Sequence, residues 1–269
     1  MTDAMSSLVP TPRQSLRDLT PARVSLPTTG HSITTNEVLS FQLAHAKARD
    51  AVHTVFHLPT FAQRLVTELP ILVEASLPVL QLRSNAPDRL AYLRRPNLGR
   101  TLHPDSVAQL RPASCQLAII IADGLSALAV ERNAIPVLAH LIPKLLADAW
   151  TIAPLTLVQQ GRVGIGDAIG FSLAASCSLI FIGERPGLSS ADSMGVYLTW
   201  SPHPDRTDAE RNCLSNIRAG GLPPEAAAAR LFWYLQTARA KGQTGISLKE
   251  DFLELDPAAG RSGRDRISP

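Results

Sequence analysis

Four glycines lie within ten residues of the chain, directly after an apolar run. They are Gly161, Gly164, Gly166 and Gly170 in GRVGIGDAIG, which follows PLTLVQ. Glycine lets the backbone approach a ligand closely, and a helix that begins near Asp167 would offer unpaired N–H donors. The spacing therefore indicates a ligand-binding loop between a strand and a helix. A tight turn that binds nothing is the alternative, and the glycines alone do not decide between the two.

Two well-known glycine-rich nucleotide loops do not fit this stretch. The spacing is G-x-G-x-x-x-G, whereas the dinucleotide-binding loop has G-x-G-x-x-G, and Asp167 stands where a pyrophosphate would meet the helix. No Gly-Lys followed by Ser or Thr is present, so the sequence has no Walker loop. A nicotinamide-dependent Rossmann dehydrogenase is therefore kept only as an alternative function.

The cysteines and histidines do not follow the pattern of a metal centre. Cys115, Cys177 and Cys213 are widely spaced and odd in number, which favours reduced thiols over a disulfide framework or a zinc site. His53 and His57 have i, i+4 spacing, but no HExxH sequence or partnering carboxylate pattern accompanies them. We therefore expect no metal site in this chain.

The composition is that of a globular protein. The chain has 269 residues, of which 45% are hydrophobic, and its net charge of +3 gives little support for a nucleic-acid groove. No apolar run approaches the roughly 20 residues that span a bilayer, and the N-terminus lacks the pattern of a signal peptide. We expect a cytoplasmic protein.

Helical patterns dominate the first part of the chain. Residues 1–30 are rich in Pro, Thr and Ser, and we expect them to form a flexible arm. Leu39, Leu43 and Ala46 then fall on one stripe of a predicted helix of about five turns. We therefore expect a helical N-terminal domain over residues 31–112.

Apolar runs that alternate with helical patterns follow. QLAIIIADG is an unbroken apolar run typical of a strand buried on both faces, and the next runs are PLTLVQ, SLIFIGE and GVYLTW. The first helical segment between them should be interrupted by Pro136 and Pro143. This alternation predicts an α/β fold, with a Rossmann-like, mostly parallel sheet and helices on both faces over residues 113–255. A disordered tail is expected at residues 256–269.

The ends of the predicted strands define a candidate site. In open parallel sheets, ligands bind beyond the carboxyl ends of the strands. The first three strands are predicted to end at residues 123–124, 161–167 and 184–187. All three turns should therefore line one edge of the sheet.

Five motifs occur in order along the chain: LRSNAPDRLAYLRRPNLGR, ADGLSA, GRVGIGDAIG, IGERPGLSSADSMGVYLTW and RNCLSNIR. Together they resemble the small subunit of ethanolamine ammonia-lyase, from about Leu19 to about Lys249. One departure is VSLPTTGHS, where the family pattern would have a glycine-rich stretch.

The resemblance implies an adenosylcobalamin-dependent enzyme that converts ethanolamine to acetaldehyde and ammonia. It implies a large TIM-barrel subunit that binds ethanolamine, while the small subunit closes over the other side of the corrin in a hetero-oligomer. The cofactor supplies the radical chemistry, so we expect no catalytic acid or base in this chain. The resemblance also allows a bacterial microcompartment as a location within the cytoplasm.

By motif position, the resemblance implies corrinoid contacts at Val163, Glu184 and Cys213. Val163 would meet the corrin edge, and its alternative is an ordinary turn residue. Glu184 would accept hydrogen bonds from corrin amides, and its alternative is a salt bridge with Arg162 or Arg185. Cys213 would act through shape or backbone, and its alternative is a buried structural thiol.

Two further expectations concern the cofactor. Some cobalamin enzymes bind cobalt through a histidine in an Asp-x-His-x-x-Gly motif, and none of the seven histidines lies in one. We therefore expect this chain to supply no cobalt ligand. The basic stretch YLRRPNLGR binds either the cofactor's phosphate or an anionic partner surface; the alternative is a solvated loop. A non-catalytic scaffold protein is the remaining alternative function.

Overall fold

Six strands form one sheet in the computed structural model, which describes residues 20, 22–112 and 114–248. Their order across the sheet is β3 (Val79–Arg83), β5 (Leu155–Gln159), β4 (Leu117–Ala122), β6 (Cys177–Gly183), β7 (Met194–Trp200) and β8 (Asn212–Ile217). The first four are parallel, whereas β7 and β8 are antiparallel to their neighbours. The predicted α/β class with a mostly parallel sheet is confirmed.

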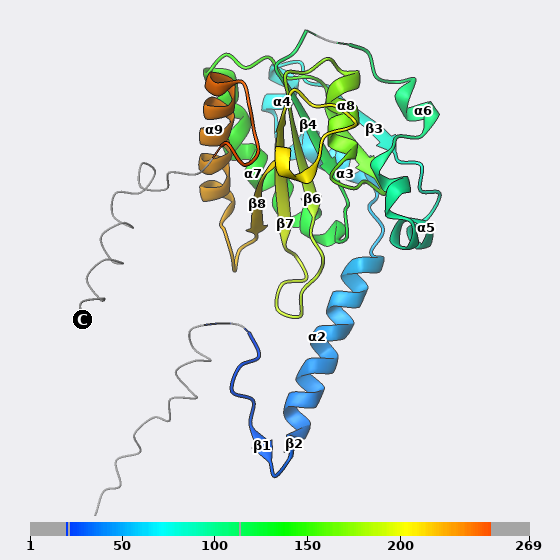
Figure 1. The fold of residues 1–269 in the computed structure, drawn as a ribbon, viewed down its shortest axis with the longest axis vertical. Helices are drawn as coiled ribbons and strands as arrows, with labels where there is room; N and C mark the ends of the chain where they lie inside the picture. The colour runs from blue at the N-terminus through cyan, green and yellow to red at the C-terminus, as the bar shows by residue number, and fades with distance from the viewer. Residues whose placement is uncertain (1–19, 21, 113, 249–269) are drawn as a thin grey trace, which may run out of the picture.

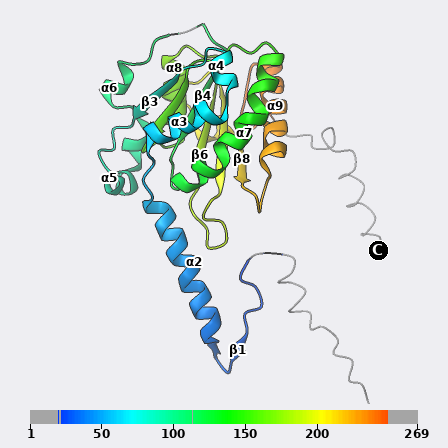
Figure 2. The same ribbon diagram turned by 180° about the vertical axis from the view of Figure 1, so that it is seen from behind.

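Helices cover both faces of this sheet (Figures 1 and 2). They are α3 (Leu58–Glu68), α7 (Ala127–Ala147) and α9 (Pro224–Lys241) on one face and α8 (Ile165–Ser172) on the other. Alternate β4 side chains enter the two layers: Ile119 and Ile121 pack toward α7, and Ala118 and Ile120 pack toward α8. All six residues of β4 are buried, as the unbroken apolar run predicted.

The helix α7 runs through both of its prolines. The prediction that Pro136 and Pro143 interrupt the helical segment is wrong, since both lie inside α7. Each proline removes one backbone hydrogen bond of the helix. However, neighbouring residues such as Ile135, Val137 and Ile142 are buried in the core, and this packing offsets the loss.

The sheet extends into the part of the chain that was predicted to be mostly helical. The strand β3 was not predicted; it pairs in parallel with β5 and is an outer strand of the sheet. The other elements between residues 71 and 112 are helical, namely α4 (Ile71–Glu74), α5 (Arg89–Arg94), η1 (Pro96–Arg100) and α6 (Pro104–Val107). A further short 3-10 helix, η2 (Asp208–Glu210), follows later in the chain. Residues 79–83 thus belong to the same sheet as the strands after residue 113.

The helix α2 (Thr35–His53) projects from the body, on the side where β6 ends (Figure 1). Only Ala51 is buried among its 19 residues. Leu39 and Leu43, on the predicted stripe, are 58% and 59% exposed. A short hairpin of β1 (Thr28–Thr29) and β2 (Ser32–Ile33) lies at the far end of α2. The two leucines of the stripe are therefore largely uncovered by the described residues.

Two predicted segments fall wholly or mainly outside the described residues. The predicted arm is described only at residue 20 and from residue 22 onward, and the predicted tail at residues 256–269 is not described. Within the part of the chain that is described, no helix has both the length and the apolar character needed to cross a bilayer.

Candidate functional site

The turns after β4, β5 and β6 meet at the carboxyl ends of these strands and line a cavity of about 360 Å³. The lining residues are Tyr92 of α5, Gly124 and Leu125 after β4, Arg162 and Val163 after β5, Ile182, Gly183, Glu184 and Arg185 at the end of β6, and Tyr197 of β7. Two of the three predicted contact residues, Val163 and Glu184, therefore lie on the same cavity.

Cys213 lies beside this cavity. It is paired with Tyr197 across the antiparallel strands β7 and β8, so the two side chains share a face of the sheet. The two side chains lie close enough for each to alter the pKa of the other. The structure thus brings the three predicted residues together, while their role toward a cofactor stays a prediction.

Polar groups near β7 and on β8 hold the Glu184 carboxylate. The Ser193 hydroxyl donates to Oε2 at 2.5 Å, and the Asn216 backbone N–H donates to the same oxygen at 3.3 Å. Neither Arg162 nor Arg185 forms an ion pair with it in the described structure, so the salt-bridge alternative is not supported. Glu184 therefore faces the cavity with a carboxylate that has no cationic partner among the described residues.

Most of the glycines in GRVGIGDAIG serve packing of the protein itself. A Cβ on Gly161 would lie 2.8 Å from the Ala122 side chain, and one on Gly166 would lie 3.0 Å from Ile180. A Cβ on Gly170 would lie 2.7 Å from Pro202. These positions need glycine because the turn and α8 pack tightly on the sheet. The turn alternative thus explains three of the four glycines, although the loop also carries Val163 to the cavity.

Asp167 points into the protein and does not face a ligand at the start of α8. Its side chain is 2% exposed, and Arg211 Nε donates to Oδ2 at 3.0 Å. Burial raises the pKa of Asp167, while the bond to Arg211 opposes that rise. Asp167 therefore does not stand at a ligand position, as the sequence had led us to expect, although the glycine spacing still differs from that of a dinucleotide loop.

Cys213 is exposed, whereas Cys115 and Cys177 are buried. The alternative of a buried structural thiol is therefore wrong for Cys213. Its sulfur nevertheless lies against Tyr197, and this partial burial, together with the nearby Glu184 carboxylate, raises the pKa of the thiol to about 11. Cys213 is thus a neutral thiol at physiological pH, which does not suit a nucleophile.

The raised pKa predicts slow alkylation of Cys213. In the native protein at pH 7.5, iodoacetamide should modify Cys213 at least about tenfold more slowly than it modifies glutathione, because little thiolate is present. The rate should rise with pH up to about pH 11, because the thiolate fraction increases over this range. Mass spectrometry of the Cys213 peptide gives the rate at each pH, and a rate at pH 7.5 equal to that of glutathione would contradict the assignment.

The predicted basic stretch lies on the surface near the start of α8. Arg94, Arg95 and Arg100 are exposed and form no ion pair among the described residues. Arg100 also lines a second cavity of about 270 Å³, with Arg206 and Arg211. Since these two are engaged with Glu210 and Asp167, the geometry leaves both interpretations of the stretch open.

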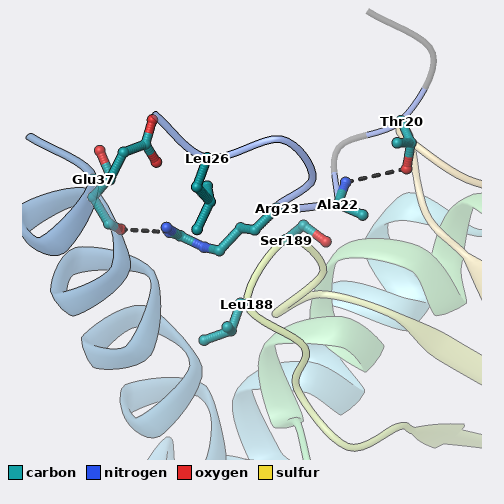
Figure 3. A pocket seen from close by; sticks show the side chains of 8 residues that line it. Thr20, Ala22, Arg23, Leu26, Glu37, Leu188 and Ser189 are labelled. Carbon is teal, nitrogen blue, oxygen red and sulfur yellow. Dashed lines mark hydrogen bonds between the residues drawn. The ribbon is translucent and has the colours of Figure 1, made fainter. Parts of the chain in front are cut away.

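A larger cavity, of about 550 Å³, lies between α2, the segment before it and the β6–β7 loop (Figure 3). Arg23 donates to the Ser40 carbonyl at 2.8 Å and stacks over the Phe41 ring at 5.4 Å. The turns after β4 and β5 do not reach this cavity. Because strand ends and their turns are the usual ligand positions in such sheets, the smaller cavity is the better candidate site.

Metal-ligand groupings are not found in the described part of the chain: no three His, Cys, Asp or Glu side chains lie close enough together to hold an ion. The residues that line the candidate cavity include no histidine.

Comparison with known proteins decides the family. The family model for "Ethanolamine ammonia-lyase light chain (EutC)" matches residues 10–249. The chain belongs to this family. The ethanolamine ammonia-lyase small subunit of Pseudomonas putida strain W619 is 46% identical over 256 residues, which cover 92% of each chain. That of Bradyrhizobium diazoefficiens is 46% identical over 91% of this chain and 93% of its own, and that of Azotobacter vinelandii is 45% identical over 94% of each.

Membership of the ethanolamine ammonia-lyase light-chain family confirms the resemblance drawn from the five motifs. It supports an ammonia-lyase subunit over the dehydrogenase and scaffold alternatives. A small subunit also implies a large-subunit partner.

Proposed function

We propose that this chain is the small subunit of an adenosylcobalamin-dependent ethanolamine ammonia-lyase that converts ethanolamine to acetaldehyde and ammonia. In this proposal the cobalamin binds at the carboxyl ends of β4, β5 and β6, and the large subunit closes over its other side. The observation that carries the proposal is the cavity that brings Val163 and Glu184 together, with Cys213 beside it, in a chain of this family.

The cavity residues fit a corrinoid, which has an apolar ring and amide side chains. Val163, Leu125 and Ile182 supply apolar surface, while the Glu184 carboxylate accepts hydrogen bonds. Arg162 lines the same cavity, and its buried Nε has no hydrogen-bond partner among the described residues. A cavity wall with apolar side chains and a few polar groups is the usual form of a cofactor site.

This chain contributes binding and orientation to the reaction. Adenosylcobalamin, when bound, supplies the organic radical that starts the rearrangement of ethanolamine. Val163 and Glu184 would hold the corrin periphery, and Cys213 and Tyr197 would close the wall against water. None of these groups needs to transfer a proton, so the catalytic groups belong to the large subunit.

The size of the cavity supports a partner chain. Cavities of about 300–1,000 Å³ enclose drug-sized ligands, and a corrin with its nucleotide tail is larger than these. A cavity of about 360 Å³ therefore holds only part of the cofactor. The rest needs cover from a second chain, and the large subunit is the partner that membership of the family implies.

The exposed helix α2 supports the same arrangement. Most of the stability of a helix in a protein comes from packing of its apolar face, yet α2 buries only Ala51 of its 19 residues. Its exposed Leu39 and Leu43 lie one turn apart, which makes a small apolar surface. Since α2 projects on the side of the sheet where the cavity lies, a chain that covers the cofactor also meets α2 (Figure 1). We assign the α2 stripe to the interface with the large subunit.

Replacing Glu184 tests the cofactor site. If its carboxylate accepts hydrogen bonds from the corrin, Glu184→Ala in the reconstituted complex should weaken cobalamin binding by about 1 to 3 kcal/mol, or about five- to 150-fold. The subunits should stay assembled, because the carboxylate lies on the cavity wall and not on α2. Equilibrium titration with cyanocobalamin, followed by absorbance, measures the affinity.

Two further variants control for structural effects. Glu184→Gln keeps one acceptor oxygen and should lose less affinity than Glu184→Ala. Asp205→Ala removes an exposed carboxylate that lies outside the cavity lining and should leave the affinity unchanged. Unchanged cobalamin affinity in an assembled Glu184→Ala complex would show that this residue only holds Ser193 and Asn216.

A further inference from the structure

Arg89 connects several segments at the carboxyl ends of the strands, beside the cavity. From α5, its Nη1 donates to the Gly124 carbonyl at 2.8 Å and to Gln160 Oε1 at 3.3 Å. The same nitrogen lies 3.4 Å from Asp123 Oδ2. Its Nε donates at 2.7 Å to the Val52 carbonyl in the last turn of α2. One side chain thus joins α2, the turn after β4 and the turn after β5.

Asp123 completes this connection from the sheet side. It is 2% exposed at the end of β4, and its Oδ1 accepts the Gly161 N–H at 3.1 Å while Oδ2 faces Arg89. The side chain of Arg89 is 16% exposed, so the ion pair is largely buried. Removal of one member of such a pair leaves the other charge buried and unpaired. The two turns therefore depend on both side chains.

Tyr92 connects the Arg89–Asp123 ion pair with the cavity wall. Two guanidinium groups lie over its ring, with the Arg89 Cζ 4.8 Å and the Arg162 Cζ 4.2 Å from the ring centroid. Its hydroxyl donates to the Gly161 carbonyl at 3.0 Å. Tyr92 and Arg162 line the cavity, whereas Arg89 and Asp123 do not. The pair thus acts on the cavity through the residues it holds.

The backbone segments after β4 and at the end of β6 are tightly packed and have little room to move. A Cβ on Gly183 would lie 2.0 Å from the Ser126 carbonyl oxygen and 2.5 Å from that of Asp123. Gly124 has a φ of +56° and packs against the Gly183 backbone. The turns after β4 and β6 are therefore in backbone contact, and a displaced β4 turn would also disturb Glu184.

We propose that Arg89 and Asp123 are positioning residues for the cobalamin site: the pair fixes the turns that carry Gly124 and Val163, so that the cavity wall is formed before the cofactor binds. This inference rests on the proposed function. A preformed wall raises affinity because the turns need not be ordered on binding. Neither side chain contacts the cofactor in this scheme.

A matched control exists at the other end of the strands. Arg239 of α9 forms an ion pair with Asp148, donates to the Asp148 carbonyl at 3.2 Å and stacks over the Trp150 ring at 4.6 Å. Arg239 therefore has the same kinds of partner as Arg89, but these partners lie on the segment that precedes β5. Arg239→Gln removes a comparable set of contacts without touching the cavity edge.

Two measurements on the small–large subunit complex test the proposal. Without cofactor, hydrogen exchange should become faster in peptides that contain residues 123–126 and 160–164 in Arg89→Gln, and stay unchanged there in Arg239→Gln. In cyanocobalamin titrations, Arg89→Gln should bind about tenfold or more weakly, while Arg239→Gln should stay within about twofold of the wild type. Arg89→Lys keeps the charge opposite Asp123 and should recover part of the affinity, which makes it the second variant if Arg89→Gln does not assemble.

The possible outcomes distinguish failure of the positioning role from failure of the proposed function. Wild-type affinity in the Arg89 variants, or an equal loss in Arg239→Gln, would overturn the positioning role. A wild-type complex that binds no cobalamin would contradict the proposed function itself, and the positioning role would fall with it. Faster exchange in both turns, together with weaker binding in Arg89→Gln alone, is the result that we expect.

Discussion

Alone with adenosylcobalamin and ethanolamine, this chain is expected to release no ammonia above the cofactor-only background. The cavity at its strand ends is too small to enclose a corrin, and in the proposed function the Glu184 carboxylate on its wall accepts hydrogen bonds from the corrin amides and does not act on ethanolamine. Addition of the large subunit from the same organism should restore turnover, and neither chain should be active alone. A coupled assay of ammonia and acetaldehyde measures both conditions. Turnover by the purified single chain would refute the division of labour between the subunits.

Charged residues on the exposed stripe of α2 are expected to abolish assembly with the large subunit. The double variant Leu39→Asp/Leu43→Asp would bury two carboxylates in the proposed interface, which costs several kcal/mol and should weaken association by about 100-fold or more. Size-exclusion chromatography of the co-expressed chains should then give separate peaks.

The matched control is Val66→Asp/Val73→Asp, which changes two exposed valines on α3 and α4, away from α2. This variant should still co-elute with the large subunit. Circular dichroism should report unchanged helix content for both variants, because all four positions are exposed. An assembled Leu39→Asp/Leu43→Asp complex would remove α2 from the interface.

The central strands were predictable because burial on both faces leaves a clear sequence signal. The six residues of β4 are all apolar and all buried. β3 was missed because it is an edge strand of five residues in which only Leu82 is buried, while Gln81 and Arg83 are exposed. Its sequence therefore resembles a surface segment, and its place in the sheet depends on pairing with β5, which lies more than 70 residues later.

The candidate site was predictable only in part. Strand ends mark a shared edge of a parallel sheet, so the positions of Val163 and Glu184 on one cavity could be expected from the order of strands and turns. The contact between Arg89 and Asp123 could not be expected from the sequence, because the two residues are 34 positions apart and meet only after α5 packs beside the sheet. Similarly, the stripe on α2 predicted an amphipathic helix, but periodicity does not tell whether another chain covers it.

An electron cryo-microscopy structure of the reconstituted small–large subunit complex with bound cobalamin tests the proposed cobalamin site most directly. We expect corrin density at the carboxyl ends of β4, β5 and β6, in contact with Val163, Glu184 and Cys213, with the large subunit on its other side. Density enclosed wholly by the large subunit, with these three residues out of contact, would contradict it.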